Sequence, residues 1–201
     1  MKSIEDKMLS KIYGYGKGYA FSSGDFIKDF SINNIDKALS TLTQQNKIRR
    51  IARGLYDYPK YSEFLKQELS ADIDQAARAI ARKFNWQIEI SGESALNLLG
   101  LSTQVPAKYI YLSNGSNRSY LIQDTMRLEF KKSALKNIGF KYKESSIIVQ
   151  ALKALGKENI TDDTITHIKA YLDPKLYEKI LNDTKTATTW IYETIKIICQ
   201  H

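Results

Sequence analysis

Cysteine and histidine are almost absent from this 201-residue sequence, which contains only Cys199, His167 and His201. A single cysteine excludes a disulfide within the chain and favours a reducing compartment. Two histidines leave a structural zinc site almost no ligands. We therefore expect no metal centre, no cofactor and a cytoplasmic location.

Long apolar runs and nucleotide-binding signatures are also missing. No apolar run approaches the roughly 20 residues that a membrane-spanning helix needs, and the N-terminal sequence MKSIEDKMLSKIYG lacks the apolar core of a signal peptide. Gly14, Gly16 and Gly18 do not lie between a strand and a helix with the spacing of a phosphate-binding loop. We expect no membrane contact, and no nucleotide-dependent enzyme class is indicated.

Positive charge is the main compositional feature. The net charge is +8 and the pI about 9.3, while 43% apolar and 26% charged residues are ordinary for a globular protein. Residues 1–66 carry 12 Lys/Arg against 7 Asp/Glu, and residues 67–201 carry 18 against 15. The excess in the first third favours a polyanionic partner for that part of the chain.

The first third predicts three short helices, with a short apolar piece after the first, and then a hairpin. Helical spacing of apolar residues begins after Ser3 and ends at a glycine cluster, a brief second helix follows Ser22 or Ser23, and a third helix covers 33–47. In the third helix Ile35, Ala38, Leu39 and Leu42 form one apolar stripe. Its opposite face is polar and carries Asn33, Asn34, Lys37, Ser40, Thr41 and Gln44.

Amides, hydroxyls and a lysine are the side chains that hydrogen-bond base edges and phosphates in a major groove. The same residues also make an ordinary solvated helix face, so this face alone does not decide between the two interpretations.

The segment after the third helix favours DNA binding. The sequence KIRRIARGLYDYP alternates in a strand-like manner on both sides of Gly54, with Ile48, Ile51 and Leu55 suited to cover the helical core. Arginine binds phosphate bidentately and fits a narrow minor groove. A charged hairpin kept for solubility is the alternative. The order of elements predicts a winged helix-turn-helix, whose cationic residues are Lys47, Arg49, Arg50, Arg53 and Lys60.

A polar segment near residues 61–72 predicts a boundary, giving a winged-helix domain over 1–66 and an α+β domain over 67–201. We expect helices over 72–84, 92–101, 145–156, 161–172, 173–181 and 188–199. Strands are expected over 86–91 and 126–132. Segments 107–113 and 118–123 predict a hairpin with Asn114-Gly115 at its tip. The predicted fold class is α+β, with a small sheet and C-terminal helices.

Two segments carry a family resemblance. The segment SGESALNLLGLSTQVPAKYIYLSNG, residues 91–115, together with the earlier IRRIARGLYDYP, resembles the AbiEi family of antitoxins of type IV toxin–antitoxin systems, over roughly residues 20–155. By this resemblance, an N-terminal winged helix binds inverted repeats in the promoter of its own operon, and a C-terminal domain is associated with antitoxicity. The implied toxin is a nucleotidyltransferase-like protein that is countered without a stable complex.

Of the family's functional residues, only the DNA-contacting face carries over to this sequence, as Arg49, Arg50, Arg53 and the polar face of the third helix. The 91–108 motif has a purely architectural interpretation, because its Gly, Ser, Thr and Pro residues suit turns and helix caps. The helices after Gly156 match no known role.

The main enzymatic alternative is a metal-dependent nuclease. Asp124, Glu129 and Lys131 stand in an order similar to that of restriction endonucleases, and Glu89 or Glu93 could supply a second carboxylate for Mg²⁺. Alternating charge on an exposed strand face explains the same residues.

The sequence therefore predicts a non-enzymatic DNA-binding autorepressor and antitoxin. A non-catalytic module that binds a protein or RNA partner is the third alternative.

Overall fold

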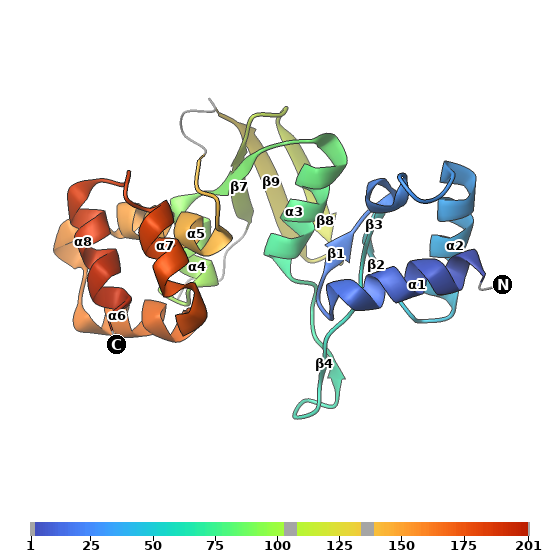
Figure 1. Ribbon diagram of the computed structural model, residues 1–201, viewed down its shortest axis with the longest axis horizontal. Helices are drawn as coiled ribbons and strands as arrows, with labels where there is room; N and C mark the ends of the chain where they lie inside the picture. Colours follow the sequence, from blue (N-terminus) through green and yellow to red (C-terminus); the bar gives the residue numbers. More distant parts are fainter. Residues whose placement is uncertain (1–2, 103–107, 134–138, 201) are drawn as a thin grey trace. The chain divides into compact units, whose positions relative to one another are not determined.

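The computed structural model describes residues 3–102, 108–133 and 139–200 (Figure 1). It has a mixed α+β architecture with small sheets and a helical C-terminal part, which confirms the predicted fold class. Among the described residues no helix is long and apolar enough to cross a membrane.

The chain divides into two compact units. The first comprises Met1–Trp86 and Ser119–Leu128, and the second comprises Gln87–Arg118 and Glu129–His201. This division lies further along the chain than the predicted boundary at residue 66. The first unit also includes Ser119–Leu128, which is distant in sequence. No local change in composition could indicate that this segment belongs there.

The first unit opens with helix α1, Ile4–Tyr15. Ser3 caps it as predicted, because its hydroxyl accepts from the Asp6 backbone while the Asp6 carboxylate accepts from the Ser3 backbone. Strand β1, Ala20–Phe21, follows. The expected short second helix is a 3-10 turn, η1, Ser23–Phe26, in which Ser22 and Asp25 bond reciprocally.

Helix α2, Ile32–Gln44, is the predicted third helix. Ile35, Ala38, Leu39 and Leu42 are all at most 1% exposed, so the predicted apolar stripe is the buried one. The stripe packs with Met8 and Ile12 of α1 and with Phe21, Phe26 and Ile48 in one core. The helix stops before Asn46, which adopts a left-handed φ of 55°.

Strands β2, Arg49–Ala52, and β3, Leu55–Asp57, form the predicted basic hairpin. The sheet order is β1-β3-β2, with Arg50 opposite Tyr56 and Arg49 opposite Asp57. Gly54 has a φ of 69°, which the tight turn requires. Ile48, Ile51 and Leu55 are buried, as predicted.

A second hairpin follows where only a polar boundary was predicted. Strands β4, Tyr61–Ser62, and β5, Gln67–Glu68, pair antiparallel. Figure 1 shows this hairpin, at the label β4, extending from the rest of its unit. Strands of two residues are too short to produce an alternating pattern, so the sequence did not predict them.

Helix α3, Ile73–Phe84, belongs to the first unit although it was predicted in the second domain. Asp72 caps it, and its apolar side is buried. Arg82 ties its last turn to the first unit, because its guanidinium donates to the Asp25 carboxylate at 2.8 Å and to the Ala20 carbonyl at 2.7 Å.

The third sheet has the strand order β6-β7-β9-β8. Its strands are β6, Ile88–Ile90; β7, Tyr109–Ser113; β8, Arg118–Ile122; and β9, Met126–Lys132. The predicted pairing of the segments 107–113 and 118–123 is wrong, because β9 lies between them. Gln123 and Asp124 both adopt a left-handed φ, which makes the β8–β9 connection the tight one. Asn114 bonds Gln87, beside β6, instead.

The second unit is mainly helical. Its helices are α4, Gly92–Leu98; α5, Lys143–Leu155; α6, Asp162–Tyr171; α7, Tyr177–Asp183; and α8, Thr189–Ile198. The 3-10 turn η3, Lys157–Asn159, lies between α5 and α6, and the 3-10 turn η4, Pro174–Leu176, lies between α6 and α7. Asp173 caps η4 at Lys175, so the expected helix over 173–181 begins as a 3-10 turn. Cys199 is buried.

Candidate nucleic-acid interface

The polar face of α2 is open to solvent. Asn33, Asn34, Lys37, Ser40 and Gln44 are exposed, and Thr41 is half-buried. The helix is held from behind by its buried stripe, and Thr43 is turned inward, donating to the Leu39 carbonyl at 2.7 Å. The residues that could contact bases therefore project from a rigidly packed helix, which keeps their positions defined.

Four exposed cations, one on α2 and three in the segment that follows it, lack acidic partners. Among the described residues, Lys37, Lys47, Arg50 and Arg53 form no ion pair, and all four are exposed. Charges that no carboxylate neutralises remain available to a polyanion. Arg50 projects from β2, and Arg53 lies in the turn that Gly54 completes.

Arg49 has a different role from the one expected of it. Its guanidinium holds the Asp57 carboxylate bidentately, with Nε–Oδ1 at 3.1 Å and Nη2–Oδ2 at 2.7 Å, and also donates to the Leu69 carbonyl. Glu68 lies 3.5 Å away. Because the guanidinium N–H groups already donate to Asp57 and Leu69, Arg49 is not available to bind phosphate. We therefore leave it out of the candidate interface.

Burial raises the pKa of Asp57, and the hydrogen bond and charge of Arg49 oppose that rise. The Asp57 side chain is 2% exposed, so its charge depends on this one arginine for compensation. The pair closes the β2–β3 hairpin and is structural.

Lys83 is a cation that the sequence did not single out. A Cβ built on Gly54 would lie 3.2 Å from Lys83 Nζ, so the ammonium group sits beside the hairpin turn next to Arg53. Lys83 comes from the last turn of α3. It is distant in sequence and was predicted in the other domain, so no sequence pattern could have placed it here.

Lys60 lies at the base of the second hairpin. Its aliphatic carbons pack on Gly18, whose φ of 86° and lack of a side chain permit the contact. The Lys60 residue remains exposed. Its ammonium group is therefore available at the edge of the first unit, while its stem serves packing.

The residues of the nuclease alternative have separate local roles. Asp124 is exposed in the β8–β9 turn, Glu129 lies 3.3 Å from Lys108, and Lys131 is exposed further along β9. Among the described residues, no three or more His, Cys, Asp and Glu side chains form a group that could hold a metal ion. Glu93 lies exposed in the first turn of α4.

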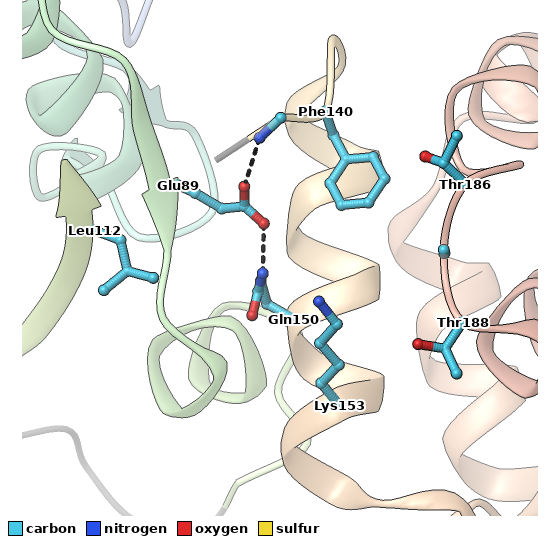
Figure 2. Close-up of a pocket in the computed structure, with 9 residues that line it drawn as sticks. Glu89, Leu112, Phe140, Gln150, Lys153, Thr186 and Thr188 are labelled. Atoms are coloured by element: carbon cyan, nitrogen blue, oxygen red, sulfur yellow. Dashed lines mark hydrogen bonds between the residues drawn. The ribbon is translucent and has the colours of Figure 1, made fainter. Parts of the chain in front are cut away.

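Glu89 instead lines a cavity of about 500 Å³ within the second unit. The Gly139 backbone N–H donates to the Glu89 carboxylate at 3.0 Å, and the Gln150 side-chain amide donates to the other carboxylate oxygen, as Figure 2 shows. Lys153, Thr186 and Thr188 border the same cavity. Because both carboxylate oxygens already accept hydrogen bonds from the protein, Glu89 serves to tie β6 to α5.

The 91–108 motif is architectural in its described part. Ser94 Oγ accepts from the Ile110 backbone at 2.7 Å and lies 3.1 Å from Ser91 Oγ, which fastens α4 to β7. Gly92 packs directly on Ala154 of α5. Residues 103–107, which include Thr103, Val105 and Pro106, lie outside the described residues.

Comparisons with known proteins identify a family for this chain but assign it no activity. No curated protein matches the chain. Among solved structures, the RV2827C protein from Mycobacterium tuberculosis is similar at 12% sequence identity and a TM-score of 0.39, covering 96% of this chain and 76% of that one. Overlap of this quality supports no argument about the site. A family model matches residues 7–180, and the chain therefore belongs to the family described as a family of unknown function, DUF6088.

Proposed function

We propose that this protein is a DNA-binding transcriptional autorepressor and antitoxin of a type IV toxin–antitoxin system, of the abortive-infection kind, acting in the cytoplasm. The observation that carries the DNA-binding part is the exposed polar face of α2, set over a fully buried stripe and accompanied by exposed cations without carboxylate partners. The antitoxin part follows from the AbiEi resemblance.

In this proposal α2 enters the major groove, and Asn33, Asn34, Lys37, Ser40, Thr41 and Gln44 contact base edges and flanking phosphates. Arg50, Arg53, Lys47 and Lys60 contact the backbone, with Lys83 beside the hairpin turn. The target is double-stranded DNA with inverted repeats in the promoter of its own operon. The functional partner is a nucleotidyltransferase-like toxin that is countered without a stable complex.

The DNA-binding part is tested by gel-shift titration of the full chain on its own upstream region and on a scrambled duplex. We expect Arg50→Ala/Arg53→Ala to weaken binding to both duplexes, because backbone contacts carry no base preference. Lys37→Ala or Gln44→Ala is expected to reduce the preference for the upstream region, by about 1–3 kcal/mol per lost base contact.

The matched control is Lys179→Ala/Lys185→Ala, which removes the same charge from exposed positions of the second unit. If the hairpin double variant binds both duplexes as tightly as this control, the interface assignment is wrong. A chain that binds no duplex at low salt would contradict DNA binding altogether.

The antitoxin part is tested by co-expression with a neighbouring nucleotidyltransferase-like reading frame, scored as rescue of growth. Point variants suit this test better than truncation after residue 66, because Ser119–Leu128 belongs to the first unit. We expect Arg50→Ala/Arg53→Ala to lose repression and retain rescue. Absence of rescue by the wild-type chain would remove the antitoxin assignment and leave DNA binding intact.

A further inference from the structure

The β4–β5 hairpin, called here the arm and comprising residues 60–69, exposes more apolar side chain than its size explains. Phe64 is 92% exposed, Leu65 52%, Tyr61 46% and Leu69 37%. Single exposed apolar residues are common on protein surfaces, but four within one ten-residue hairpin concentrate apolar surface there, and concentrations of exposed apolar surface are typical of interaction sites.

The arm is anchored at its base and bare at its tip. The Leu69 backbone donates to the Lys60 carbonyl at 2.8 Å, and Arg49 donates to the Leu69 carbonyl at 3.0 Å. Beyond that, the strands form two residue pairs, Tyr61 with Glu68 and Ser62 with Gln67, and the Leu65 backbone donates to Ser62 Oγ at 3.1 Å. An isolated two-stranded ribbon is marginally stable in water, so covering it by another surface is energetically favourable.

Charge decides what kind of surface can cover the arm. Lys60 and Lys66 are balanced by Glu63 and Glu68, so the arm is neutral in a chain of net charge +8. A ribbon that enters DNA must neutralise phosphates, and carboxylates beside the apolar tip would oppose this. The neutral, apolar tip therefore fits a protein surface and does not fit DNA.

The tip is also self-complementary. Glu63 and Lys66 flank Phe64 and Leu65, so two arms related by a two-fold axis place Glu63 of each copy opposite Lys66 of the other, with the apolar side chains between them. In the isolated chain this ion pair is loose, at 3.8 Å, and both side chains are largely exposed. An interface in which residue i meets j, and j meets i, is the form that two-fold dimers take.

We propose that the arm is a self-association surface through which two copies of this chain form a symmetric dimer. As a further consequence, which rests on the proposed function, such a dimer presents two copies of α2 and so matches an inverted repeat. The association itself requires no DNA.

Sedimentation equilibrium of the full chain tests the association without DNA. We expect a concentration-dependent dimer, and an association constant lowered about tenfold or more by Phe64→Ser/Leu65→Ser, because buried aromatic anchors dominate interface energy. Leu121→Ser is the matched control, since Leu121 is 52% exposed outside the arm. Circular dichroism confirms that the variants fold. A monomeric wild type, or a dimer that the arm variant leaves unchanged, overturns the proposal.

Charge reversal tests the two-fold geometry. Glu63→Lys places lysine opposite lysine, and Lys66→Glu places glutamate opposite glutamate, so each variant alone should dimerise more weakly than wild type. In an equimolar mixture both cross-contacts become attractive, and heterodimers should form. An ion pair within one chain predicts no gain on mixing, and that outcome overturns the geometry.

Two further outcomes separate this proposal from the proposed function. Arg50→Ala/Arg53→Ala should lose DNA affinity and dimerise as wild type does, so a failure of DNA binding leaves the arm untouched. If Phe64→Ser/Leu65→Ser weakens binding to a single half-site duplex and leaves the association constant unchanged, the arm contacts DNA and the self-association proposal is wrong.

Discussion

At the scale of single residues, neighbouring arginines that look alike in the sequence have opposite surroundings. Arg50 is exposed on β2, whereas Arg49 is held by a buried carboxylate. The alternation of a β-strand places successive side chains on opposite faces, which accounts for the difference. The charge of Arg49 is therefore needed for the fold, and that of Arg50 is available to a ligand.

The first prediction concerns Arg49→Ala, which leaves the Asp57 carboxylate buried without a cation. We expect the free energy of unfolding to fall by about 3 kcal/mol near pH 7. Arg50→Ala, at an exposed position, should change it by less than about 0.5 kcal/mol. Urea denaturation measures both. Equal stability of the two variants would show that the Arg49–Asp57 pair contributes nothing to folding.

The pH dependence of this loss has a definite sign. Burial raises the pKa of Asp57 in the folded state above its unfolded value, so ionisation costs stability above the folded pKa, and this cost disappears as the pH falls through it. Arg49→Ala removes the two interactions that lower the pKa, so the pKa rises further. The difference in unfolding free energy between wild type and Arg49→Ala should therefore shrink as the pH falls from about 7 towards 4.5. A deficit that grows on acidification would contradict this account.

The second prediction concerns Cys199, which is 7% exposed and whose thiol pKa is raised by burial. Because the thiolate is the reactive form, a thiol reagent should modify the folded chain slowly at neutral pH and the urea-unfolded chain quickly. Mass spectrometry of timed reactions measures both rates. Similar rates in the two states would show that Cys199 is not protected.

At the scale of elements, glycines of similar appearance in the sequence differ in what surrounds them. Gly92 opens α4 against α5, where an added Cβ would lie 2.6 Å from the Ala154 Cβ and 3.1 Å from the Gln150 carbonyl oxygen. Gly14 lies in α1 with nothing within 4 Å of such an atom. The first position is closed to a side chain and the second is open.

The third prediction follows from this contrast. Gly92→Ala should lower the free energy of unfolding by about 1–3 kcal/mol, because backbone and helix must shift to make room. Gly14→Ala should raise it by about 0.5–1 kcal/mol, because alanine loses less conformational entropy in a helix. Thermal denaturation of both variants measures the difference. A stable Gly92→Ala would mean that the α4–α5 contact is looser than described.

At the scale of the whole molecule, a net charge of +8 affects any encounter with a polyanion, and the exposed cations of the first unit localise that effect. Binding that neutralises phosphates releases counterions, so its strength depends on salt. The number of free cations that contact phosphate therefore predicts how steeply DNA affinity falls with salt concentration.

The fourth prediction is that the logarithm of the DNA association constant falls linearly with the logarithm of salt concentration. Arg50→Ala/Arg53→Ala should flatten this slope by about two, one for each lost phosphate contact. Lys179→Ala/Lys185→Ala should leave the slope unchanged. Fluorescence anisotropy over a salt series measures all three. Equal slopes for the two double variants would argue against a role of the hairpin cations.

Local periodicity was sufficient to predict much of the fold. Patterns of a few residues predicted the helix after Ser3, the apolar stripe of α2, the basic hairpin, the helix that is α3 and the helical C-terminal part, and the structure bears them out. The four residues of the β4 and β5 strands were too few to give a pattern. The wrong partner for β7 arose because Asn-Gly suggested a hairpin turn, whereas Gln123 and Asp124 make the tight connection.

The sequence by itself determined which faces of the elements are apolar and where positive charge is concentrated, because burial of apolar surface acts through spacing along one element. Only the tertiary structure decided which charges are free. It engaged Arg49 with Asp57, brought Lys83 from another helix to the Gly54 turn, and left the tip of the arm uncovered. These outcomes depend on contacts between segments that are far apart in the chain, and no local pattern encodes them.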